Sequence, residues 1–180
     1  MEVFYDFVRR LVKGFESVGL DYMFTGALAV SFYGLPRTTV DVDVVVWVAE
    51  REHRAKLVSA LKMAELVVDE REIDKALESG YRIATFRDTK TAYSVDVMLS
   101  NKKLEKRAGM IAGVKTFFQT PEDLILAKLR MIKATVPKER ALKDEEDVKA
   151  ILKFTKVNVD TVKKQAGKDS TFSIFESLVV

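Results

Sequence analysis

The sequence predicts an α+β fold: a small mixed β-sheet flanked by helices and followed by a C-terminal helical segment. Three observations support this fold class. Strand-like and helix-like patterns alternate over residues 1–119, and the run from Thr39 to Val48 is so apolar that it predicts a central strand covered on both faces. From Thr120 onwards the apolar spacing is helical. We therefore expect one mixed α/β domain over residues 1–119, with a helical segment packed on it over residues 120–180.

The composition excludes several classes of protein. Hydrophobic residues make up 48% of the 180 residues, and 30 basic against 27 acidic residues leave a net charge of +3, too even to indicate nucleic-acid binding by charge alone. There is no cysteine and one histidine, His53, which excludes disulfides, thiolate metal sites and zinc sites with several histidines. No apolar run approaches the length of a membrane span and the N-terminus does not resemble a signal peptide, so we expect a cytoplasmic protein.

The first half of the chain is predicted element by element from its periodicity. Apolar residues at spacings of three and four predict a helix over residues 2–17. Further elements follow as a strand at 22–25, a short buried helix at 27–33, the central strand at 39–48, a surface helix at 51–62, a short strand at 65–69 and a helix at 70–79. Two strands at 81–86 and 92–99 surround a polar turn, which is typical of a hairpin.

The second half begins with a basic turn or short helix at 101–107 and strand material at 110–118 around Gly113. Thr120 then has the features of a helix N-cap, because Pro121 follows it and Asp123 stands three residues after it. We expect helices over residues 121–134, 138–154 and 158–166. The tail from Phe172 to Val180 is either a last helical turn or a partner-binding end.

Three aspartates stand in otherwise apolar strands. Asp41 and Asp43 alternate in one strand, so their side chains share a face with Cα atoms roughly 7 Å apart. Asp96 interrupts a second apolar run. If the two strands are neighbours, the three carboxylates converge, and hard oxygen donors of this kind suit Mg²⁺ and phosphoryl or nucleotidyl transfer. Alternatively, Asp41 and Asp43 cap a strand in solvent, and Asp96 is a hairpin-edge acid paired with Arg82 or Lys90.

Thr25-Gly26 supplies a complementary feature. A strand ends at this step, the glycine allows close backbone approach, and a helix begins at Ala27. Free N–H groups at a helix N-terminus bind phosphate. The alternative is an ordinary strand-to-helix turn that favours glycine.

Together these residues resemble the nucleotidyltransferase superfamily, which has the DNA polymerase β-like palm fold, and are most similar to its minimal and AbiEii-type prokaryotic members. The likeness spans about residues 20–152. The family's glycine step and R-[TS]-x-D-[IV]-D motif match Gly26-Ala27 and Arg37-Thr38 with Asp41-Val42-Asp43, with one extra residue before the first aspartate. A helix at Thr120–Leu129 also matches. So does a later R-x-x-K-D-x-x-D segment, whose residues are Arg140, Lys143, Asp144 and Asp147.

The resemblance implies transfer of a nucleoside monophosphate from ATP or another NTP to an acceptor hydroxyl, with release of pyrophosphate. Asp41, Asp43 and Asp96 would be catalytic and bind Mg²⁺. Gly26, Ala27, Arg37 and Thr38 would bind the nucleotide, and we add Lys128 as a hypothesis, either reaching the triphosphate or remaining a solvated helix lysine. For Arg140, Lys143, Asp144 and Asp147, whose helical spacings suit surface ion pairs, a structural brace that ties the helix to the palm is the better interpretation.

The resemblance leaves open a role in a toxin–antitoxin pair, an unidentified acceptor (tRNA, protein or small molecule), a partner protein and an oligomer. Its alternative is a module that binds nucleotide or a partner without catalysis. Two features favour that alternative: the apolar tail, and Ala27, which stands where many members have serine or a second glycine.

Overall fold

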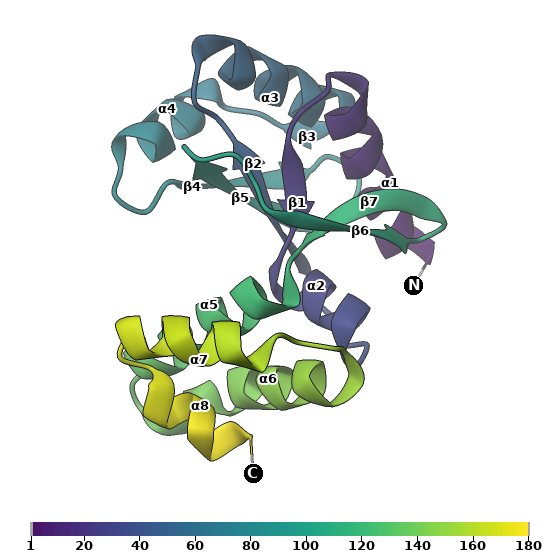
Figure 1. The fold of residues 1–180 in the computed structure, drawn as a ribbon. Helices are drawn as coiled ribbons and strands as arrows, with labels where there is room; N and C mark the ends of the chain where they lie inside the picture. Colours follow the sequence, from purple (N-terminus) through teal and green to yellow (C-terminus); the bar gives the residue numbers. More distant parts are fainter. Residues whose placement is uncertain (1, 180) are drawn as a thin grey trace. The chain divides into compact units, whose positions relative to one another are not determined.

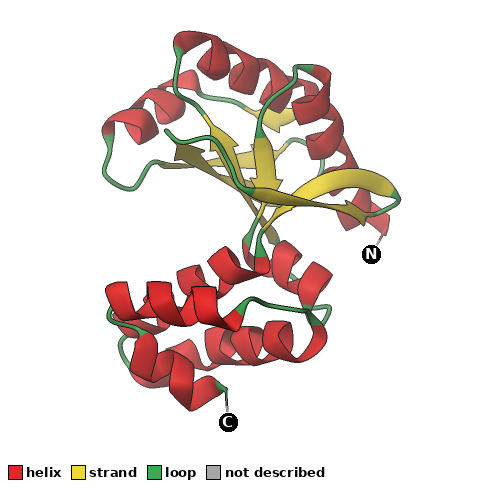
Figure 2. Ribbon diagram, in the orientation of Figure 1, coloured by secondary structure: helices red, strands yellow, loops and turns green. Residues whose placement is uncertain are grey.

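The computed structural model describes residues 2–179 and divides into two compact units, one with a β-sheet and one built from helices (Figures 1 and 2). The first unit contains the chain up to Leu28 together with Thr38–Phe118. The second contains Ala29–Arg37 and the chain from Gln119 onwards. The sequence gives no sign that residues 29–37 belong with the C-terminal helices. No helix among the described residues is long and apolar enough to cross a membrane.

The sheet has seven strands in the order β3-β4-β5-β2-β1-β7-β6. It is mixed, because β2 runs parallel to β5, and β1 runs antiparallel to β2 but parallel to β7. The strands are β1 Tyr22–Phe24, β2 Asp41–Trp47, β3 Leu66–Val67, β4 Ile83–Asp88, β5 Ser94–Ser100, β6 Lys106–Ile111 and β7 Val114–Gln119. This architecture confirms the predicted fold class.

Helices lie against the sheet of the first unit (Figure 1). They are α1 Glu2–Ser17, α3 Arg51–Met63 and α4 Glu70–Glu78, while α2 Gly26–Tyr33 begins in the first unit and ends in the second. Helix α1 packs beside α3 so closely that a Cβ added at Gly14 would lie 2.5 Å from the carbonyl oxygen of Ala60. The residues of α1 that are predicted to face the core, such as Phe7 and Leu11, are fully buried.

The central position predicted for the strand at 39–48 is confirmed, but its predicted burial on both faces is wrong. Val42, Val44 and Val46 are fully buried on one face. The other face carries Asp41, which is exposed, and Asp43, which is half-buried. Because a pleated strand alternates its side chains, the valines fill the core while the acids remain on the more open face.

The second unit contains α5 Pro121–Ala134, a 3₁₀ helix Lys138–Ala141, α6 Leu142–Phe154, α7 Val159–Lys168 and α8 Phe172–Leu178. The predicted N-cap is confirmed, since Thr120 Oγ1 accepts a hydrogen bond from the Asp123 backbone N–H at 3.3 Å. Residues 29–37 are tied to these helices, because the Thr155 hydroxyl donates to the Tyr33 carbonyl oxygen at 2.6 Å.

Two local predictions change in the structure. Residues 101–107 were expected to form a basic turn or short helix, but β6 begins at Lys106 and pairs with β7 across the turn at Gly113. Lys106 lies 3.9 Å from the centre of the Phe117 ring on β7 and donates to Asp21, just before β1, at 2.5 Å, so these contacts favour the extended form. The tail forms α8, which agrees with the predicted last helical turn.

A buried ion pair joins α1 to the end of β4. Arg10 donates to both carboxylate oxygens of Asp88, at 2.9 and 2.8 Å, and to the Ala64 carbonyl oxygen at 2.6 Å. The Asp88 side chain is 0% exposed. Burial alone would raise the pKa of Asp88, but the hydrogen bonds from Arg10 and Thr91 hold that pKa below its usual range.

This ion pair predicts a dependence of stability on pH. Because the pKa of Asp88 is lower in the folded chain than in the unfolded chain, its stabilisation is complete above about pH 4 and is lost as the pH falls through the folded-state pKa. Asp88→Asn should lower the free energy of unfolding at pH 7 by about 3 kcal/mol, because it leaves Arg10 poorly paired. The measurement is urea unfolding at pH 7 and in steps towards pH 3, where the difference from wild type should shrink.

Glu52→Gln is the control, because Glu52 pairs with Lys56 on the surface with 70% of its side chain exposed. It should change stability little. A difference between Asp88→Asn and wild type that grows towards acid pH would contradict the assignment.

Candidate functional site

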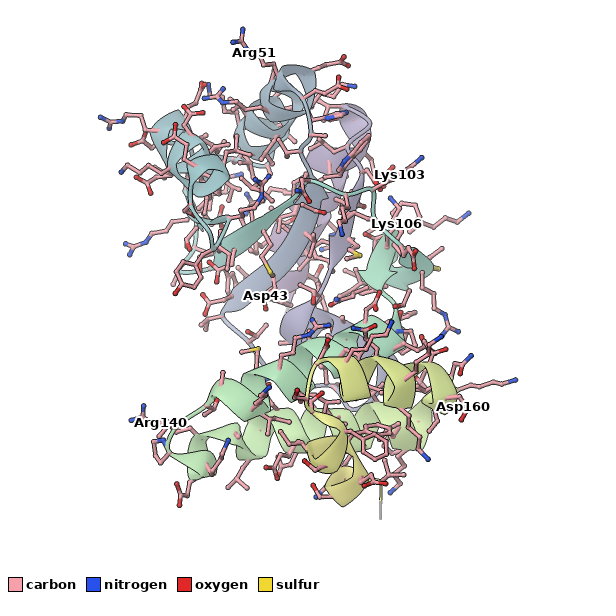
Figure 3. All side chains as sticks on the ribbon, turned by 60° about the vertical axis from the view of Figure 1, so that its left-hand side comes forward. Asp43, Arg51, Lys103, Lys106, Arg140 and Asp160 are labelled. Carbon is pink, nitrogen blue, oxygen red and sulfur yellow. The ribbon has the colours of Figure 1, made fainter. Side chains whose placement is uncertain are left out.

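The sheet places the three predicted aspartates on two adjacent parallel strands. Asp43 on β2 is directly opposite Asp96 on β5, and Asp41 is opposite Ser94. Neighbouring strands lie about 4.8 Å apart, so Asp43 and Asp96 are immediate cross-strand neighbours. Asp43 is labelled in Figure 3. The two acid-bearing strands are therefore neighbours, which is the condition under which the sequence predicts that the carboxylates converge.

Two hydroxyl groups hold two of these carboxylates. The Ser94 hydroxyl donates to Asp41 Oδ1 at 2.5 Å, and the Thr85 hydroxyl on β4 donates to Asp96 Oδ1 at 2.6 Å. The alternative that pairs Asp96 with Arg82 or Lys90 is wrong. Arg82 donates to the carbonyl oxygens of Leu99 and Leu77, and Lys90 pairs with Glu65.

Gly26 lies against the Asp43 carboxylate. Thr25 donates its backbone N–H to the Asp43 carbonyl oxygen at 3.0 Å, and the chain then turns into α2 through Gly26, whose φ is +55°. A Cβ added at Gly26 would lie 2.0 Å from Asp43 Oδ2. The glycine is therefore required by space and by backbone conformation, and the positive end of α2 lies beside a negative charge.

The three carboxylates do not come together at one point. No group of three or more acidic or histidine side chains within residues 2–179 is arranged to hold a metal ion. Asp41 and Asp96 each accept a hydrogen bond from a neighbouring hydroxyl, and Asp43 lies against Gly26. The donor set still suits Mg²⁺, which is commonly held by one or two carboxylates together with waters and substrate phosphates.

Two other predicted nucleotide-binding residues also lie in the first unit. Ala27 is 5% exposed, so its methyl group packs in the core and what it can offer a ligand is its backbone N–H in the first turn of α2. Thr38 is exposed, in the loop that leads into β2.

Arg37 and Lys128 lie in the second unit, where both contact acids of α6. Lys128 Nζ lies 2.7 Å from Asp144 Oδ1 and 2.7 Å from Asp147 Oδ2, and its side chain is 6% exposed. Arg37 lies 3.2 Å from the same Asp147 oxygen. The alternative of a solvated Lys128 is wrong, whereas phosphate binding by Lys128 stays a prediction.

The R-x-x-K-D-x-x-D segment separates into two parts. Asp144 and Asp147 take part in the ion pairs with Lys128, whereas Arg140 and Lys143 are exposed, and Arg140 extends away from its helices (Figure 3). The two aspartates therefore brace elements of the second unit to one another, whereas the sequence suggested a brace between helix and palm.

Thr85 and Ser94 were not predicted as site residues. Each stands on a strand at a position that alternates with buried residues, and threonine or serine at such a position is common. The signal that could have found them is cross-strand register, since Thr85 is opposite Asp96 and Ser94 is opposite Asp41.

Known structures share this fold, although no family model and no curated protein matches the sequence. A solution structure of the antibiotic-resistance factor ANT(2'')-Ia has a TM-score of 0.65 and 13% identity, covering 98% of this chain and 92% of that one. A crystal structure of ANT(2'')-Ia with adenylyl-2''-tobramycin also has a TM-score of 0.65 and 13% identity, covering 99% of both chains. An antigenic nucleotidyltransferase-like protein from Paracoccidioides brasiliensis has a TM-score of 0.56 and 15% identity, covering 93% of this chain and 92% of that one. The chain therefore has a nucleotidyltransferase-like fold.

The Gly26–Asp43 contact predicts that Gly26→Ala is more harmful than Gly19→Ala. Gly19 also has a positive φ, +63°, but a Cβ there would meet nothing within 4 Å. Gly19→Ala should cost about 1 kcal/mol of stability from the backbone alone. Gly26→Ala should cost at least about 1 kcal/mol more, because Asp43 must also move. The measurement is urea unfolding of both variants.

A double-mutant cycle isolates the contact. In an Asp43→Ala background the carboxylate is gone, so Gly26→Ala should be less costly than in the wild type. Equal costs in the two backgrounds would show that Asp43 does not set the requirement for glycine.

The Lys128 ion pairs predict that Lys128→Met destabilises the second unit. The change leaves Asp144 and the buried Asp147 without their shared cation, which should cost about 3 kcal/mol. Lys149→Met, an exposed site on α6, is the control and should be close to neutral. Thermal unfolding checks both variants, and equal melting temperatures would exclude the brace.

Proposed function

We propose that this protein is a nucleotidyltransferase, which moves a nucleoside monophosphate from an NTP to an acceptor hydroxyl and releases pyrophosphate. The observation that carries the proposal is the pairing of Asp43 with Asp96 across β2 and β5, directly beside Gly26 at the start of α2. The fold shared with ANT(2'')-Ia over 99% of the chain supports it.

The carboxylates are the proposed catalytic centre. Asp41 and Asp43 would hold Mg²⁺, with Asp96 completing the site as a further ligand or by accepting the proton of the attacking hydroxyl. Bound Mg²⁺ supplies neutralisation of phosphate charge and orientation of the attacking and leaving oxygens. The open face of β2 suits this use, because Asp41 is exposed and can reach a substrate without movement of the core.

Gly26, Ala27 and Thr38 are the proposed nucleotide contacts of the first unit. The backbone of Gly26 and Ala27 offers N–H groups at a helix start, and Thr38 offers an exposed hydroxyl. In the second unit, Arg37 and Lys128 are the predicted phosphate-binding cations. Each would have to bind the phosphate while it also contacts Asp147. Because ANT(2'')-Ia has been crystallised with adenylyl-2''-tobramycin, we propose ATP as the first donor to test and an aminoglycoside as one acceptor, beside tRNA and protein.

A module that binds nucleotide or a partner protein without catalysis is the second candidate, including the toxin–antitoxin role of the AbiEii-type members. The observation that favours it is the engagement of Lys128, whose charge is already balanced by two carboxylates. Binding of Mg-ATP without transfer of label to any acceptor would support this candidate over the enzyme.

The catalytic proposal predicts that Asp43→Asn and Asp96→Asn each lower the transfer rate by at least about 100-fold, because each replaces a negative oxygen donor by a neutral amide. The measurement is incorporation of label from α-³²P-labelled NTPs into bulk RNA, bulk protein and an aminoglycoside panel, with Mg²⁺ and with EDTA. Label transfer should require Mg²⁺.

Asp74→Asn is the matched control, because Asp74 is an aspartate of α4 that pairs with Arg54 outside the proposed site. It should transfer label at the wild-type rate. Unchanged transfer by both Asp43→Asn and Asp96→Asn would refute the assignment of the catalytic centre.

A further inference from the structure

We propose that Thr85 and Ser94 are positioning residues, which orient the carboxylates of Asp96 and Asp41 towards a divalent cation. This inference rests on the proposed function for its chemistry, and it adds two residues that the family motif does not contain. Both are hydroxyl side chains on strands that flank the acids, and each donates one hydrogen bond to one carboxylate oxygen.

Strand register fixes both hydroxyl–carboxylate pairs. Thr85 is the cross-strand partner of Asp96 in the antiparallel β4–β5 ladder, and Ser94 is the partner of Asp41 in the parallel β5–β2 ladder. The hydroxyls therefore reach the acids from directly opposite positions, at 2.6 and 2.5 Å. Backbone pairing holds the donors in place before any ligand arrives.

Each hydrogen bond restricts a side chain that would otherwise rotate. An aspartate has a broad χ2 well, so its two oxygens exchange places easily in solvent. A hydroxyl that binds Oδ1 selects one orientation and leaves Oδ2 and further lone pairs for another ligand. Partners of this kind orient metal-binding carboxylates. Their removal commonly lowers metal affinity or activity by roughly 10- to 100-fold.

The two hydroxyl groups are not needed to fill the core. Thr85 is exposed and Ser94 is half-buried, so water could satisfy either hydroxyl. Their removal should leave the fold intact, which separates positioning from structural support. Ser100 provides the comparison: it lies on β5 at the same alternation as Ser94, but its hydroxyl donates to the Lys102 carbonyl oxygen.

The test measures cation binding separately from turnover. Mn²⁺ is titrated into the full-length protein without nucleotide, and free Mn²⁺ is followed by electron paramagnetic resonance. Thr85→Val and Ser94→Ala should each weaken Mn²⁺ binding roughly tenfold. Thr85→Ser keeps the hydroxyl and should bind as wild type does, as should Ser100→Ala. Circular dichroism checks that each variant is folded. If Thr85→Val unfolds, the two single variants Thr85→Ser and Ser94→Ala still provide the test.

Kinetics give the second readout. Thr85→Val should lower kcat for label transfer with little change in KM for the NTP, and Thr85→Ser should restore kcat. Thr85→Val in an Asp96→Asn background should add little further loss, because the threonine acts through that aspartate.

The outcomes separate this inference from the proposed function. If Thr85→Val and Ser94→Ala bind Mn²⁺ more weakly but the wild type transfers no label, the positioning role is supported and the transferase function is refuted. If the wild type transfers label but Thr85→Val binds Mn²⁺ as tightly as the wild type, the positioning role is refuted and the transferase function is supported. Positioning is also overturned if wild type shows no saturable Mn²⁺ binding, or if Ser100→Ala weakens binding as much as Ser94→Ala does.

Discussion

The parallel pairing of β2 with β5 is the interaction on which the candidate site depends. It places Asp43 opposite Asp96 and Asp41 opposite Ser94. It also sets which face each acid occupies, because a slip of one residue would exchange the buried valines of β2 with its aspartates. Burial of Val42, Val44 and Val46 therefore stabilises the register and, with it, the arrangement of the carboxylates. The pairing of β2 with β5 therefore fixes both the core packing on one face of β2 and the positions of the carboxylates on the other face.

Much of this arrangement could be predicted from the sequence, because the signals are local. Apolar spacing marks α1, Thr120-Pro121 marks the start of α5, and the glycine step marks the turn into α2. Register between strands distant in sequence leaves no such local signal, so Thr85 could not be linked to Asp96. The contacts of Lys128 with Asp144 and Asp147 were missed because they also join residues that are distant in sequence. The sequence pattern of a helix lysine is the same whether its side chain faces solvent or a second helix. The open face of β2 was missed because valine and tryptophan at Val45 and Trp47 make the whole strand look buried.

The candidate site and the helical unit differ in what contacts their acids. At the candidate site, Asp41 and Asp96 accept hydrogen bonds from neutral hydroxyls, although ion pairs such as Arg10–Asp88 form elsewhere in the same unit. In the helical unit, Lys128 and Arg37 contact Asp147, so cations and anions there largely balance. Acids held by neutral donors are suited to attract a cation, whereas a balanced network is suited to hold helices together.

The contact between Gly26 and Asp43 also constrains how the sequence can diverge. Because the carboxylate occupies the space of a Cβ at position 26, the two positions form one steric unit. A relative with a larger residue at position 26 must have moved or lost its acid at position 43. Among distant sequences with this fold, the glycine is therefore an indicator of whether the acid is held as it is here, even where the surrounding residues have changed beyond recognition.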